Sequence, residues 1–67
     1  MYRYLITIEY DYEDKIYIVR IPDLSGCAAH GDTPEEALKE LAIVYDMWIE
    51  VAKEEGIKIP EPTRYLD

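Results

Sequence analysis

The beginning of the chain alternates between apolar and polar residues with a period of two, which is typical of β-strands. Residues 2–10 follow this pattern, residues 11–14 form a polar break, and residues 15–21 alternate again. Two alternating segments around a short polar break predict a β-hairpin with a four-residue loop. In the simplest register, Tyr10 pairs with Lys15.

The two faces of this predicted hairpin differ in polarity. With Tyr10 opposite Lys15, one face is wholly apolar, and we expect a helix to cover it. The other face carries Leu5, Ile16 and Ile18 among charged residues. Because such a face is too apolar to be purely solvated, it predicts contact with a partner or a second subunit.

From residue 34 to about residue 55 the apolar spacing changes to that of a helix. Thr33 is predicted to cap this helix in a capping box with Glu36, and Gly56 to end it. One stripe of the helix is predicted to face the core, and its members are Leu38, Leu41, Ala42, Tyr45, Trp48, Ile49 and Ala52.

The remaining short segments complete an α+β fold. Residues 27–30 are small and predict a third strand, and residues 57–59 predict a short fourth strand. The expected architecture is a three-stranded antiparallel sheet, one long helix and the short last strand. We expect a single domain over residues 1–62, followed by a C-terminal tail over residues 63–67.

Length and cysteine content predict self-association. A chain of 67 residues buries a small core, and such domains usually need a disulfide, a metal or oligomerisation. The single Cys27 excludes an internal disulfide, and one cysteine with one histidine cannot build a closed zinc site. A homodimer or higher oligomer is therefore expected.

Net charge and hydropathy limit the partners and the location. A formal charge of −8 opposes direct binding to nucleic acid and fits either a basic protein partner or simple solubility. No apolar run approaches the roughly 20 residues that span a bilayer, and the N-terminus does not resemble a signal peptide. These features predict a cytoplasmic protein without membrane contact.

Three surface clusters are candidates for protein contacts. An apolar shoulder on the helix is a candidate subunit contact, unless the sheet wraps around it, and consists of Val44, Met47 and Val51. An acidic ridge on the helix and the acidic hairpin tip are candidate sites for a basic partner, although charged faces are commonly just solvated. The ridge comprises Asp46, Glu50 and Glu54, and the tip comprises Asp11, Glu13 and Asp14.

No set of residues in the sequence supports catalysis, a metal site or a cofactor site. Glu9, Asp23 and Asp32 lie in separate predicted elements and do not converge as a two-metal site requires. Cys27 and His30 are three residues apart in a predicted strand, so they point to opposite faces and cannot form a catalytic pair. We expect the protein not to be an enzyme.

The segment between the second strand and the helix carries a distinctive combination of turn and cap residues, which we expect to be structural. They are Pro22, Asp23, Gly26, Gly31, Asp32, Thr33 and Glu36. Gly26 and Gly31 are expected to adopt conformations that other residues reach only at a cost. This segment, followed by Trp48-Ile49 and a Pro60-Glu61-Pro62 end, resembles the HicB-like antitoxin family over almost the whole chain.

The resemblance implies a partly degraded RNase H-like fold and a homodimer or larger assembly. It also implies binding and neutralisation of a small, basic, RNA-cleaving HicA-like toxin. Family members commonly continue into a C-terminal DNA-binding domain, whereas this chain ends at Asp67, so operator binding is not expected. The alternatives are an orphan homo-oligomer without a toxin and, last, a residual metal-dependent nuclease.

Overall fold

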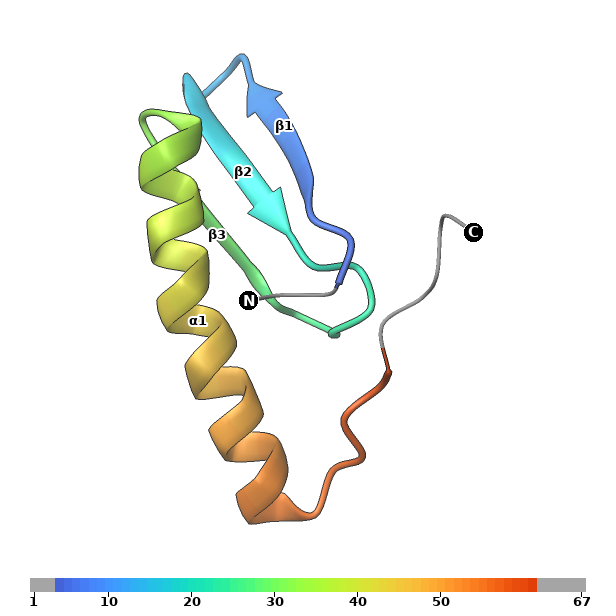
Figure 1. Cartoon of the computed structure of the whole chain (residues 1–67). Helices are drawn as coiled ribbons and strands as arrows, with labels where there is room; N and C mark the ends of the chain where they lie inside the picture. The colour runs from blue at the N-terminus through green and yellow to red at the C-terminus, as the bar shows by residue number, and fades with distance from the viewer. Residues whose placement is uncertain (1–3, 62–67) are drawn as a thin grey trace.

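A three-stranded antiparallel sheet carries one long helix on one of its faces (Figure 1). The computed structural model describes residues 4–61. Its elements are β1 (Thr7–Asp11), β2 (Ile16–Arg20), β3 (Ala28–Gly31) and α1 (Pro34–Glu55). The strand order is β1-β2-β3, with both pairs antiparallel. The predicted α+β class is confirmed.

The hairpin forms as predicted, but its register is displaced by two residues. Asp11 pairs with Ile16 and Tyr10 with Tyr17, so the loop spans residues 12–15. The Asp11 side chain explains this, because its Oδ1 accepts hydrogen bonds from the backbone N–H groups of Glu13 and Asp14, at 2.9 and 3.2 Å. A displacement of two leaves each side chain on its predicted face.

The core lies between the sheet and α1, towards the β3 side. Its fully buried side chains come from β2, the β2–β3 connection and α1, and are Val19, Ile21, Leu24, Cys27, Ala37 and Leu41. The helix packs mainly against β3 and β2. The expected helical cover is therefore confirmed for β2 and wrong for β1, where Ile8 is 50% exposed.

Both ends of α1 have the predicted caps. Thr33 is extended, and its Oγ1 accepts a hydrogen bond from the Glu36 N–H at 3.1 Å. At the other end Gly56 is left-handed, with φ of 69°, and the Ile57 N–H donates to the Ala52 carbonyl at 2.8 Å. This hydrogen bond, between the first and last of six consecutive residues, is typical of a Schellman motif.

The predicted core stripe of α1 is confirmed, with two changes at its border. Leu41 and Ala52 are buried, and the other five stripe residues are half-buried. Ala37, outside the predicted stripe, is also fully buried. Val44, predicted to be a subunit contact, packs partly against the core of its own chain.

The fourth strand predicted over residues 57–59 is wrong, because residues 57–61 have no regular structure. This segment meets the N-terminal part of the chain at Tyr4, whose hydroxyl donates to the Pro60 carbonyl. Since β1 begins only at Thr7, no strand edge lies opposite the segment at this contact. The tail predicted over residues 63–67 lies outside the described residues.

Gly26 and Gly31 are needed for different reasons. Gly26 has φ of 77°, which confirms the predicted left-handed turn. Gly31 is not among the described glycines with positive φ, so the prediction of an unusual backbone conformation is wrong there. A Cβ at Gly31 would instead lie 2.6 Å from the backbone nitrogen of Ala37. Close approach of the helix therefore selects glycine at this position.

Candidate functional site

The connection between β2 and β3 is an element of the core. Ile21 donates to the Cys27 carbonyl, Leu24 to that of Ile21 and Cys27 to that of Leu24, each at 3.0 Å. These bonds turn the side chains of all three residues inward, where each is at most 2% exposed. The Trp48 indole donates to the Ser25 carbonyl at 2.8 Å and ties the connection to α1.

Within residues 4–61, two groups have a displaced pKa, the Cys27 thiol and the Tyr4 hydroxyl. Burial raises the pKa of the Cys27 thiol, which disfavours the reactive thiolate. Burial also raises the pKa of Tyr4, and the neighbouring Tyr45, Asp23 and Glu61 add to this effect. His30 is exposed on β3, opposite Ile18, and therefore lies on the sheet face away from the core.

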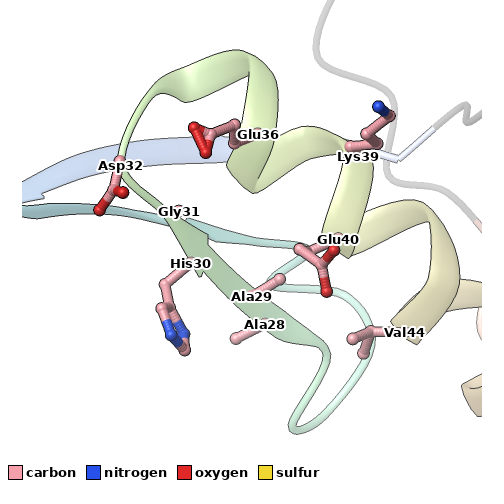
Figure 2. A pocket seen from close by; sticks show the side chains of 9 residues that line it. All are labelled: Ala28, Ala29, His30, Gly31, Asp32, Glu36, Lys39, Glu40 and Val44. Atoms are coloured by element: carbon pink, nitrogen blue, oxygen red, sulfur yellow. The ribbon is translucent and has the colours of Figure 1, made fainter.

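An open groove of about 630 Å³ runs along β3 and the first half of α1 (Figure 2). Its lining consists of Ala28, Ala29, His30, Gly31, Asp32, Glu36, Lys39, Glu40 and Val44. Because the Ile21–Cys27 pair is hydrogen-bonded, alternation along the ladder makes Val19–Ala29 the next hydrogen-bonded pair. The backbone polar groups of Ala28 and His30 therefore face the open edge of the sheet.

A second groove, apolar and about 440 Å³ in volume, continues along the C-terminal half of α1. It is lined by Ser25, Val44, Met47, Trp48, Val51, Ala52 and Ile57. Val44 lines both grooves, so the two adjoin. Met47 is 62% exposed and Val51 46%, as expected for an unburied shoulder.

The sequence interpretation missed Ile43, which extends this apolar surface. Ile43 is 53% exposed and lies one helical turn before Met47, so that Ile43, Met47 and Val51 form a row at i, i+4 and i+8. The spacing of four residues between Ile43 and Met47 was the feature of the sequence that could have identified Ile43. We call these three residues the aliphatic row.

The predicted acidic ridge and hairpin tip are separate surfaces. Asp46, Glu50 and Glu54 are all exposed on α1. Glu13 and Asp14 are exposed in the hairpin loop, whereas the Asp11 carboxylate is half-buried and holds that loop closed. The main role of Asp11 is therefore to close the loop, and Glu13 and Asp14 carry the accessible charge of the tip.

The sheet face opposite the helix is the mixed face predicted from the hairpin. Ile16 and Ile18 on β2 are half-buried, and Leu5, which precedes β1, is 40% exposed. Glu9 and Arg20 form an ion pair across this face. Because α1 lies on the other side, no helix or strand of the described residues packs on this face.

On the helix side, the β1–β2 hairpin presents a row of aromatic rings that was not predicted from the sequence. Tyr10 lies between Tyr12 and Tyr17, with ring centroids 4.9 Å apart in both pairs and edge-to-face geometry. Tyr12 is 84% exposed and Tyr10 38%. We call these three residues the tyrosine row. It was missed because the sequence predicted helical cover over this hairpin.

The sequence model of the HicB-like antitoxins of bacterial toxin–antitoxin systems matches residues 4–66. The chain belongs to this family. The match includes all four elements and the segment that connects β2 to α1.

Two curated relatives of this HicB-like chain are UPF0150 proteins. Protein ssl0259 of Synechocystis sp. is 48% identical over 44 residues, which cover 66% of this chain and 60% of the relative. Protein Ta0767 of Thermoplasma acidophilum is 38% identical over 58 residues, covering 87% of this chain and 83% of the relative. The HicB-like chain thus spans about 60% of the length of the first relative. No solved structure matches it.

The segment that suggested the HicB-like family contributes a helix cap, a turn and a close backbone contact to the fold. Thr33 caps α1, Gly26 makes a left-handed turn and Gly31 admits the helix. Within residues 4–61, no three His, Cys, Asp or Glu side chains are placed to hold a metal ion. In the same range no helix is both long and apolar enough to cross a membrane. The accessible surfaces are the remaining candidates for function.

Proposed function

We propose that this protein is an antitoxin module that binds a small, basic, RNA-cleaving HicA-like toxin and masks its RNA-binding surface. The match of the HicB-like antitoxin family to residues 4–66 carries the proposal. Inhibition is steric and electrostatic, so the chain acts as a binding protein and contributes no catalytic residue or cofactor. It has no role of its own in binding nucleic acid.

The distribution of charge supports a basic partner. The chain has 15 acidic and seven basic residues, Lys plus Arg, and its net charge is −8. Five of the six acidic residues singled out in the sequence are exposed, namely Glu13, Asp14, Asp46, Glu50 and Glu54. A positive toxin surface would be attracted over the Debye length, about 10 Å at 0.1 M salt, and would associate faster at low salt.

The test is calorimetric titration of this protein with the HicA-like toxin of the same genome, in parallel with an RNA-cleavage assay. We expect binding at low salt, a progressive loss of affinity as salt rises, and inhibition of cleavage at equimolar antitoxin. Pancreatic ribonuclease, a basic enzyme of unrelated specificity, is the control for non-specific attraction. Absence of toxin binding at about 50 mM salt contradicts the proposal.

We also propose that two copies of the chain associate through the apolar groove beside the aliphatic row. An exposed row of three large apolar side chains is unusual for a free helix face and favours a subunit contact. This observation supports the second candidate function, an orphan homo-oligomer without a toxin. The mixed sheet face with Leu5, Ile16 and Ile18 is the other candidate for that contact.

Met47→Gln is expected to weaken this self-association at least tenfold, because a symmetric dimer would lose two buried apolar side chains. Sedimentation equilibrium over a range of protein concentrations measures the change. Glu50→Gln is the matched control, since it places the same side chain at a neighbouring exposed position of α1. A monomeric wild type, or equal dissociation constants for Met47→Gln and the wild type, contradicts the assignment.

A further inference from the structure

The helix side of β1 is an apolar sheet face that the described part of the chain covers only partly. The helix packs mainly against β2 and β3, and Ile8 and Tyr10 on β1 are 50% and 38% exposed. Tyr12 follows in the loop and is 84% exposed. Three large apolar or aromatic side chains are thus accessible side by side at one edge of the sheet.

The tyrosine row is ordered before any partner arrives. Tyr17 packs against the core, Tyr10 packs on Tyr17, and Tyr12 packs on Tyr10, each in edge-to-face geometry. Aromatic pairs of this kind add about 0.5–1.5 kcal/mol beyond the area they bury. Rigid tyrosines lose little conformational entropy on binding and are enriched among residues that dominate interface energy.

The charge around the tyrosine row determines the kind of partner. Tyr12 lies in the same loop as the exposed Glu13 and Asp14. Ring faces carry negative electrostatic potential and attract arginine and lysine side chains, which the neighbouring carboxylates attract as well. The aliphatic row on α1 offers no ring face among Ile43, Met47 and Val51. It suits a second copy of the chain better than a cationic surface.

We propose that the tyrosine row and Ile8 form the docking face for the basic partner, with arginine or lysine side chains of the partner stacked on Tyr12 and Tyr10. This inference rests on the proposed antitoxin function and names its contact surface. Glu13 and Asp14 steer the partner to the face, and the rings supply the contact area. The acidic ridge of α1 stays outside the contact.

The first test measures toxin affinity by calorimetry for Tyr12→Ala, Tyr12→Phe and Lys53→Ala. Tyr12→Ala should weaken binding at least tenfold, whereas Tyr12→Phe, which keeps the ring, should stay within about threefold of the wild type. Lys53→Ala removes an exposed side chain of α1 that lies in neither proposed contact, and it should not weaken the affinity. Wild-type affinity in Tyr12→Ala overturns the proposal.

A second test separates this inference from the proposed function. The labelled protein is titrated with an acetylated, amidated peptide of four Arg-Ala repeats while backbone amide shifts are followed by NMR. We expect shifts concentrated in residues 8–17 and lost in Tyr12→Ala, whether or not the toxin binds. Shifts confined to α1, or no shifts at all, overturn the docking face. If only the toxin fails to bind, the antitoxin function is wrong and the cationic site stands.

Discussion

Gly31→Ala is expected to destabilise the protein by about 2 kcal/mol or more, towards the upper part of the range for overpacked cores. A Cβ there would lie 2.6 Å from the Ala37 nitrogen, 2.9 Å from the Glu36 Cβ and 3.0 Å from the Glu36 carbonyl carbon. The first turn of α1 cannot retreat freely, because Ala37 is fully buried in the core against the sheet. Urea unfolding followed by circular dichroism measures the loss.

Gly26→Ala is the matched control for this prediction. Gly26 has φ of 77°, and a Cβ at this position would meet no atom within 4 Å, so alanine there meets backbone strain without a steric clash. Its cost should be about 1–2 kcal/mol, the usual penalty of the left-handed region. If Gly31→Ala proves as stable as the wild type, the helix does not approach β3 as closely as described.

Leu41→Ala is expected to destabilise the protein strongly. Leu41 is fully buried in the core between the sheet and the helix. Removing such a side chain costs about 2–5 kcal/mol, through lost burial and the cavity left behind. Because small domains are only marginally stable, the variant should lose a large part of its free energy of unfolding and melt at a clearly lower temperature than the wild type. Thermal denaturation by circular dichroism measures this.

Ile43→Ala provides the comparison for Leu41→Ala. It removes an aliphatic side chain from the same helix at a position that is 53% exposed. Alanine is also the better helix former, so the net change in unfolding free energy of the monomer should stay within about 0.5 kcal/mol. Equal losses of stability in the two variants would contradict the described orientation of α1, in which Leu41 faces the core and Ile43 faces solvent.

The bounds of the helix and most of its core stripe were predictable because their signals are local. These signals are the apolar spacing, the cap at Thr33 and the end at Gly56. Each lies within one or two helical turns of the residues that it affects. The side-chain faces of the hairpin were predictable for the same reason, since alternation assigns them whatever the register. In the β2–α1 segment, the cap at Thr33 and the left-handed turn at Gly26 were predictable for the same reason.

The errors concern relations between segments. The hairpin register depended on how the Asp11 side chain closes its loop, and alternation does not encode this. The prediction of a fourth strand was wrong because residues 57–61 contact Tyr4, which lies before the start of β1. For Gly31 the residue type was recognised, but its cause, the approach of a helix that begins three residues later, is tertiary.

The candidate surfaces were only partly predictable. Exposed charges and the Met47–Val51 shoulder follow from a helical wheel. The tyrosine row does not, because its exposure depends on the helix lying over β2 and β3 instead of over the centre of the whole sheet. Which part of an apolar sheet face stays uncovered is set by the lateral position of the helix, and no periodicity specifies that position.

The position of the only tryptophan makes the two proposed contacts separately observable. Trp48 lines the apolar groove of α1 and donates to the Ser25 carbonyl, whereas Tyr10 and Tyr12 lie on the hairpin. Emission excited at the long-wavelength edge of indole absorption, where tyrosine absorbs little, would respond to events at the groove. Near-ultraviolet circular dichroism would respond to the coupled rings of the hairpin and also to the Tyr4–Tyr45 pair, so the difference between the wild type and Tyr12→Ala isolates the hairpin signal. Trp48 thus reports on the groove, and Tyr12 reports on the hairpin.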